Sequence, residues 1–219
     1  MPALPHPALV LVTDLARAPA GADAEAWLAD RVAAAVDGGV NVVQLREGQL
    51  DTPHRSELAA RLREAIGGRA LLFVNRDIAA ARAAGADGVH LPADMSVATV
   101  RSEVRAMLLI SCAVHGVDDA QRAARDGAHL LVAGTVFPSA SHPGGPTLGV
   151  AGLRAICDAV RLPVIAIGGI TPHNAFDAIA AGASGVAAIG ALLDAPDTTD
   201  AARRLRAAVE RAVRVGPCV

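Results

Sequence analysis

Short β-branched, apolar runs alternate along the chain with longer Ala-rich stretches that carry arginines, and several of these stretches end in glycine. Glycine is the usual left-handed cap of a helix, so each unit predicts a helix followed by a strand. Strands and helices in alternation favour parallel pairing in βαβ units. The predicted strands are Ala8–Asp14, Val40–Arg46, Ala70–Asn75, Gly88–Leu91, Leu108–Val114, Leu130–Val136, Pro163–Gly169 and Gly185–Gly190.

The stretches between the strands mostly predict single helices. A weak repeat of the form Ala/Asp-Gly followed by a small residue precedes the second, fourth, sixth and eighth strands, and four copies of a two-strand, two-helix unit have the symmetry of a (β/α)8 barrel. The alternative, an open doubly wound sheet, favours a Gly-rich loop after the first strand, but Thr13-Asp14-Leu15 contains no glycine. The predicted helices include Glu25–Asp37, Asp77–Ala84, Asp118–Asp126, Val150–Val160, Pro172–Ala181 and Thr198–Val213.

We therefore predict an α/β fold, a single-domain (β/α)8 TIM barrel over residues 1–219, with flexible ends at 1–6 and 215–219. The composition agrees with this fold, because 53% of the residues are hydrophobic but only 2% are aromatic. Small side chains of this kind pack well between helices and a parallel sheet.

Charge and hydropathy exclude several classes of partner. The net charge of −2 does not favour nucleic acid or an anionic membrane. No apolar run approaches the roughly 20 residues of a membrane span, and the first residues lack the basic region of a signal peptide. All 20 basic residues are arginines, so a lysine Schiff base is excluded and any phosphate must be bound by other groups.

The cysteines, Cys112, Cys157 and Cys218, match neither a metal-binding nor a disulfide spacing. Free thiols are typical of a reducing compartment, so we expect a cytoplasmic protein. The sequence leaves a homodimer open.

In a barrel, the active site forms where strands end and the following loops begin. After the seventh strand come Gly168 and Gly169, and after the eighth come Ile189 and Gly190. Glycine lets backbone N–H groups approach an anion closely, so these two loops predict a phosphate site. A tight turn without a ligand is the alternative for a lone Gly-Gly pair.

The second strand ends with two polar side chains on one face, Gln44 and Arg46. An arginine among apolar neighbours is costly to bury without an anion, which favours a ligand-binding role. The alternative is a salt bridge from Arg46 to Asp14 or Glu47.

His115 follows the fifth strand and is the candidate for proton transfer near neutral pH, whereas His90 is predicted to point into the barrel as a hydrogen-bonded interior residue. The loop Phe137–Pro146 is long and rich in Gly, Pro and hydroxyls, which favours a mobile flap over a plain surface loop. Asp77 and Asp94 could ligate Mg²⁺ or could equally cap helices.

Taken in order, these motifs resemble the thiamine phosphate synthase and thiazole tautomerase superfamily over nearly the whole chain. The matching segments include Leu11-Val12-Thr13-Asp14, Val43-Gln44-Leu45-Arg46-Glu47, Gly85-Ala86-Asp87-Gly88-Val89-His90-Leu91, Gly134-Thr135-Val136-Phe137-Pro138-Ser139 and Ala166-Ile167-Gly168-Gly169-Ile170-Thr171. The resemblance implies an enzyme that binds a small thiazole phosphate. The substrate-binding residues that it implies are Gln44, Arg46, Asn75, Thr135, Ser139, Ser141 and His142.

The two branches of the superfamily differ in chemistry. The synthase branch joins a pyrimidine diphosphate to the thiazole phosphate, releases pyrophosphate and needs Mg²⁺, whereas the tautomerase branch moves a proton and needs no cofactor. Here Gly48 replaces a lysine of the synthase pattern, Arg76 replaces a metal-binding aspartate and His142 replaces the lysine of the flap.

These departures favour a thiazole tautomerase-like enzyme that acts through His115 without a metal. The first alternative is a thiamine phosphate synthase with Mg²⁺ held by Asp94 and Asp77. The second alternative is a non-catalytic protein that binds thiazole phosphate.

Overall fold

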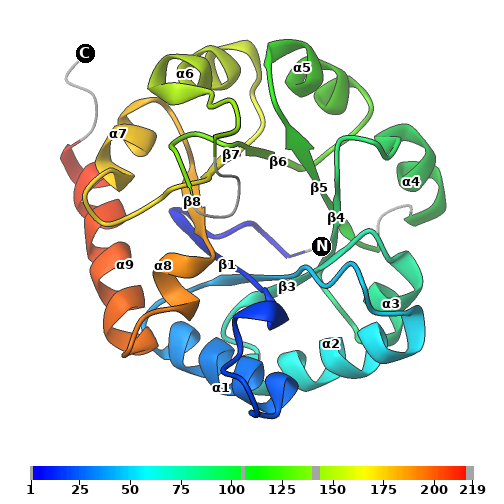
Figure 1. Cartoon of the computed structure of the whole chain (residues 1–219). Coiled ribbons are helices and arrows are strands. Elements are labelled where there is room, and N and C mark those ends of the chain that lie inside the picture. Colours follow the sequence, from blue (N-terminus) through cyan, green and yellow to red (C-terminus); the bar gives the residue numbers. More distant parts are fainter. Residues whose placement is uncertain (1, 105–106, 140–143, 216–219) are drawn as a thin grey trace.

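The structure, a computed structural model, describes residues 2–104, 107–139 and 144–215. Eight parallel strands close into a barrel in which each strand pairs with its neighbours in sequence and β8 pairs with β1. Figure 1 shows this ring of strands inside a ring of helices. The strands are β1 (Ala8–Val12), β2 (Val42–Leu45), β3 (Leu71–Asn75), β4 (Gly88–Leu91), β5 (Leu109–Val114), β6 (Leu130–Ala133), β7 (Val164–Ile167) and β8 (Gly185–Ala188).

Helices follow the strands around the outside of the barrel. The last helix packs against both α7 and α1, so it covers the side of the ring where the chain closes (Figure 1). The helices are α1 (Ala24–Asp37), α2 (Thr52–Ile66), α3 (Ile78–Ala83), α4 (Val97–Val104), α5 (Val117–Arg125), α6 (Gly149–Ala159), α7 (Ala175–Ala180), α8 (Gly190–Leu193) and α9 (Thr198–Val215), and a short 3-10 helix, η1, spans Leu15–Arg17.

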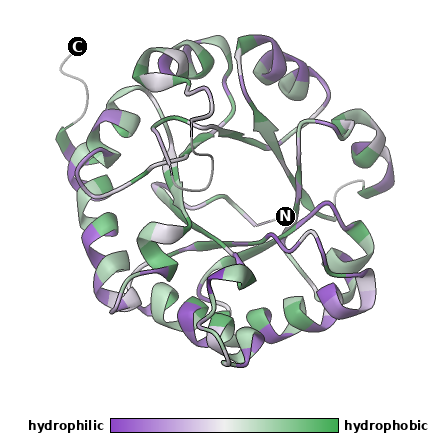
Figure 2. Cartoon of the chain, viewed as in Figure 1, coloured by the Kyte–Doolittle hydropathy of each residue, from purple (hydrophilic) through white to green (hydrophobic). Residues whose placement is uncertain are grey.

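Two apolar cores follow from the alternation of side chains along the strands. In β1, Leu9 and Leu11 pack outward against the helices, whereas Ala8, Val10 and Val12 point into the barrel. Both sets are buried, which explains why the strands are continuous apolar runs rather than alternating ones. In Figure 2 the polar positions of the helices lie mainly on the outer side of the ring.

The predicted barrel is confirmed, and the differences lie at the ends of strands. Thr13 and Asp14 were assigned to the first strand, but β1 ends at Val12 and Asp14 begins η1. Arg46 likewise lies just beyond β2. The N–H of Thr13 still donates to the carbonyl oxygen of Gln44 at 3.0 Å, so the two chain segments stay joined just beyond the ends of β1 and β2. None of the helices in the described part of the chain is long and apolar enough to cross a membrane.

Candidate active site

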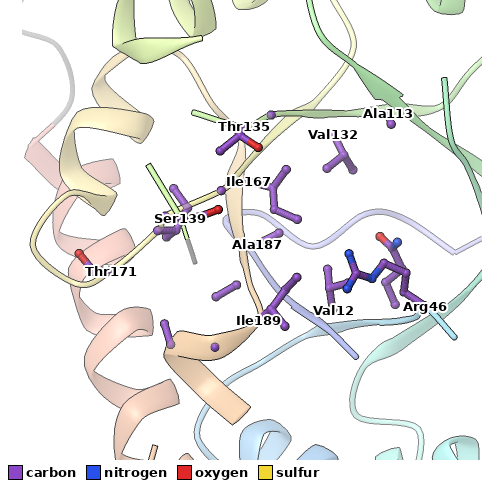
Figure 3. A pocket seen from close by; sticks show the side chains of 18 of the residues that line it. Val12, Arg46, Ala113, Val132, Thr135, Ser139, Ile167, Thr171, Ala187 and Ile189 are labelled. Carbon is purple, nitrogen blue, oxygen red and sulfur yellow. The ribbon is translucent and has the colours of Figure 1, made fainter. Parts of the chain in front are cut away.

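A cavity of about 480 Å³ opens at the carboxyl ends of the strands. Figure 3 shows Thr171 and Ser139 near one end of it, Arg46 near the other, and apolar side chains such as Ile167 between them. The cavity therefore has two polar ends and an apolar middle. Of the predicted site residues, the lining includes Gln44, Arg46, His115, Thr135, Ser139, Gly168, Gly169, Ile189 and Gly190.

The loop after β7 brings its backbone unusually close to the loop after β6. A Cβ at Gly168 would lie 2.4 Å from Cγ2 of Thr135, and one at Gly169 would lie 2.4 Å from the carbonyl oxygen of Pro138. Both glycines also have positive φ, at 99° and 63°. The sequence places glycine here because only glycine fits both the conformation and the space.

The carbonyl groups of this loop are already engaged. The oxygen of Gly168 accepts from the N–H of Phe137 at 3.0 Å, and the oxygen of Gly169 accepts from the side-chain amide of Asn174 at 2.8 Å. The N–H of Gly169 makes no hydrogen bond within the described part of the chain. A donor of this kind at a cavity wall suits an anionic ligand.

Arg17, which the sequence analysis did not single out, lines the same cavity beside Gly190. Its guanidinium pairs with Asp14 at 3.0 Å and also with Asp194. No sequence pattern indicates a role for it, because Arg17 does not directly follow a strand. It is the last residue of η1, which begins three residues after the end of β1.

At the other end, a buried hydrogen-bond chain fixes the end of β2. The N–H of Arg46 donates to the hydroxyl of Thr13 at 2.9 Å, and that hydroxyl donates to Glu47 at 2.7 Å. Burial raises the pKa of the Glu47 carboxyl, although bonds from Thr13 and the N–H of Leu15 oppose the shift. Nη2 of Arg46 lies 3.8 Å from Oδ2 of Asp14, so the salt bridge considered as the alternative is present but long. Because 37% of the Arg46 side chain is exposed, its guanidinium is still accessible to a ligand.

The two candidate histidines occupy different environments. His90 is buried, shares a 2.9 Å hydrogen bond with Ser111, and has its pKa lowered to about 4 by burial and by the charge of Arg46. It is therefore neutral, and the prediction of an interior residue is confirmed. Nδ1 of His115 lies 2.6 Å from the carbonyl oxygen of Gly134, which can only accept, so Nδ1 carries the proton and Nε2 is free to act as a base.

Asn75, Ser139, Ser141 and His142 complete the predicted substrate-binding set. Asn75 ends β3 but does not line the cavity, so the prediction of substrate contact finds no support in its position. Ser141 and His142, and the centre of the predicted flap, lie outside the described residues. Ser139 is described, and its buried Oγ has no hydrogen-bond partner there, which suits a ligand contact.

The two candidate metal ligands are occupied by other partners. Asp77 caps α3 by accepting from the N–H of Ala80 at 2.8 Å and pairs with Arg55 at 2.6 Å. Asp94 pairs with Arg76 at 2.8 Å. Neither lines the cavity, and the described residues contain no group of three or more side chains that could hold a metal ion. As placed, these residues do not fit a Mg²⁺ site.

Fold and site together define a TIM-barrel protein with a cavity at the carboxyl ends of its strands, lined by two arginines and by the glycine loops after β7 and β8. Residues 9–192 match the family model described as thiamine monophosphate synthase. Thiamine-phosphate synthases of Chloroflexus aurantiacus and Methanoculleus marisnigri are 41% and 45% identical over 181 and 179 residues, covering 81% and 80% of this chain and 83% and 84% of the relatives.

A solved structure agrees with these relatives. Thiamine phosphate pyrophosphorylase from Pyrococcus furiosus superposes with a TM-score of 0.83 at 32% identity, over 94% of this chain and 96% of that one. The chain belongs to the thiamine monophosphate synthase family, and it is an enzyme of thiamine biosynthesis.

Proposed function

We propose that the protein is a thiamine phosphate synthase, which joins hydroxymethylpyrimidine diphosphate to thiazole phosphate and releases pyrophosphate. The sequence analysis placed this activity second, after a tautomerase. Two observations favour it: relatives with this name match most of the chain, and the cavity has cationic or N–H donors at both ends. A tautomerase needs one phosphate site, whereas a synthase must hold two phosphorylated substrates.

Each end of the cavity takes one substrate in this proposal. The N–H groups around Gly169 and Gly190 bind the phosphate of the thiazole, and Arg46 with Gln44 binds the diphosphate of the pyrimidine. The two rings meet over the apolar middle of the cavity, where Ile167 and Ile189 lie in Figure 3. Apolar walls keep water away from a reactive cation.

The reaction breaks the bond between the pyrimidine methylene carbon and the diphosphate oxygen, and pyrophosphate leaves with the electron pair. The ring nitrogen of the thiazole then gives its lone pair to the carbon, which develops cationic character, and forms the new C–N bond. Arg46 contributes by stabilising the charge that grows on the leaving group. Because Asp77 and Asp94 do not fit a metal site as placed, these roles rest on the protein's own donors.

Steady-state kinetics of Arg46→Ala test the assignment of the two ends. The variant should have a kcat about 100-fold lower and a higher KM for the pyrimidine diphosphate. Removing one oriented donor that stabilises charge in the transition state lowers kcat on this scale. The KM for thiazole phosphate should stay within about twofold of wild type, since Arg46 does not contact that substrate in this arrangement. A larger effect on thiazole phosphate than on the diphosphate would contradict the assignment.

The tautomerase remains a second candidate because of His115. Its Nδ1 is held by the carbonyl oxygen of Gly134, and the residue lines the cavity, so Nε2 is the nitrogen left for proton transfer. If His115 moves a proton, His115→Gln abolishes aromatisation of the thiazole while ligand binding is kept. If the protein is only a synthase, no aromatisation is seen with either form.

A further inference from the structure

The guanidinium of Arg17 lies against the backbone of the loop that follows β8. A Cβ added at Gly190 would stand 2.9 Å from Nη1 of Arg17 and 2.7 Å from Oδ2 of Asp194. The guanidinium of Arg17 and the carboxylate of Asp194 thus occupy the space that a side chain would fill at position 190. The φ angle of Gly190 is not positive, so the glycine is explained by this close approach and not by backbone conformation.

Arg17 is held in place before any ligand arrives. Its Nε donates to Asp14 at 3.0 Å, and only 20% of its side chain is exposed. The 3-10 helix that carries it is anchored from the opposite side, because the N–H of Leu15 donates to both oxygens of the buried Glu47 at 3.2 Å. Little side-chain freedom would therefore be lost when Arg17 contacts a ligand.

The two carboxylates that pair with Arg17 differ in exposure. The side chain of Asp14 is 23% exposed, whereas that of Asp194 is 54% exposed. An anion that approaches Gly190 from the cavity repels Asp194, which can turn into solvent. Asp14 then keeps the guanidinium in position, and Arg17 exchanges one carboxylate for the arriving oxygen atoms.

We propose that Arg17 is a direct ligand of the substrate's phosphate group at the loop after β8, and that it makes the enzyme selective for a phosphorylated thiazole over the corresponding alcohol. This rests on the proposed function for the identity of the ring, but the anion-binding role of Arg17 does not depend on turnover. A planar guanidinium matches the spacing of phosphate oxygens and forms charge-assisted hydrogen bonds with them.

Calorimetric titration of Arg17→Ala with two ligands tests the role of Arg17. The ligands are thiazole phosphate and the same thiazole with a free hydroxyl group. Loss of a charge-assisted contact should weaken binding of the phosphate by about tenfold or more, while binding of the alcohol changes less than about twofold. Arg17→Lys should recover part of the loss, because it keeps the charge without the fork geometry.

Arg31→Ala is the matched control. Arg31 also ties distant elements together, since it donates to the carbonyl oxygen of Ala195 and to the hydroxyl of Thr198 at 2.7 Å each, but it does not line the cavity. This variant should lower thermal stability and leave both binding constants within about twofold of wild type.

Gly190→Ala adds a coupling test. In wild type the new methyl group displaces the guanidinium and should weaken phosphate binding, whereas in an Arg17→Ala background the same change should cost clearly less, because the Nη1 contact is gone. Equal costs in the two backgrounds would overturn the proposed contact.

The outcomes separate this inference from the proposed function. If Arg17→Ala lowers the affinity for both ligands equally, or for neither, Arg17 is not a phosphate ligand, even when wild type makes thiamine phosphate. If it weakens only the phosphorylated ligand while wild type makes no thiamine phosphate, the inference holds and the proposed function fails. A wild-type chain that binds neither ligand would overturn both.

Discussion

The hydroxyl of Thr13 joins the ends of the first two strands, because it donates to the buried carboxylate of Glu47 at 2.7 Å and accepts from the N–H of Arg46. Glu47 also accepts a hydrogen bond from the N–H of Leu15, at the start of the 3-10 helix that carries Arg17. One buried carboxylate therefore positions both arginines that line the cavity. Glu47 itself does not line the cavity.

Glu47→Gln should change the pH dependence of stability. Burial raises the pKa of Glu47 in the folded state above its ordinary value of 4.5, so wild type loses stability as pH rises from about 4.5 through the raised value. The glutamine variant lacks this loss. Its free energy of unfolding relative to wild type, measured in urea, should therefore increase over this window and level off above it. A difference that does not change with pH would contradict the assignment.

His90 should give the opposite pH dependence. Burial lowers its pKa to about 4, below the ordinary 6.5, so the stability that the neutral ring contributes is complete above pH 6.5 and is lost as pH falls towards 4. The shift corresponds to up to about 3 kcal/mol. Urea unfolding of wild type minus that of His90→Gln should show this loss between about pH 6.5 and 4. A parallel pair of curves would mean that His90 titrates normally.

Gly169→Ala should remove phosphate binding through the backbone. The added methyl group meets the carbonyl oxygens of Pro138 and Phe137 at 2.4 and 2.8 Å, so the loop must move. Gly68→Ala is the control, because Gly68 also has positive φ, at 74°, but nothing lies within 4 Å of an added Cβ. Both variants should lose about 1 kcal/mol of stability from the conformation alone.

Titration with thiazole phosphate then separates the two glycine variants. Only Gly169→Ala should lose affinity, by about tenfold or more, because only its methyl group displaces the cavity wall. Equal affinities in the two variants would show that the loop after β7 does not bind the phosphate.

The candidate metal ligands should behave as structural residues. Asp77→Ala removes a helix cap and takes the carboxylate partner from the largely buried Arg55, which keeps only its bonds to the carbonyl oxygens of Glu47 and Leu50, so it should cost about 2 kcal/mol or more. Asp94→Ala removes only an exposed pair with Arg76 and should leave the free energy of unfolding nearly unchanged. Without a diphosphate, Mg²⁺ should not raise the melting temperature of wild type. Stabilisation by Mg²⁺ that both variants abolish would establish a metal site.

The barrel could be predicted from sequence because the alternation of strands and helices is regular and local. That the loops after β7 and β8 lie together could be predicted, because a barrel places the ends of these strands side by side, so Gly168 and Gly190 need no contact information. Arg17 could not be predicted, since η1 is too short to give a periodic signal and its position depends on Glu47. Asn75 ends β3 but is absent from the cavity lining, so its predicted contact with substrate stays a prediction.

The choice between synthase and tautomerase could not be made from the departures in the motif. Because the whole chain lacks lysine, the lysines of the synthase pattern are missing here. Their loss does not show which groups supply the positive charge instead. At the end assigned to the diphosphate, Arg46 of the synthase pattern is retained and lines the cavity. The loss of a lysine is therefore weak evidence for the loss of a diphosphate site in this protein.

The most direct test of the proposed function supplies purified protein with hydroxymethylpyrimidine diphosphate, aromatic thiazole phosphate and Mg²⁺, and measures thiamine phosphate and pyrophosphate together. A synthase forms the two products in equal amounts, with turnover that depends on both substrates. No thiamine phosphate under these conditions, combined with His115-dependent aromatisation of the thiazole precursor in a parallel assay, would contradict the proposed function and favour the tautomerase.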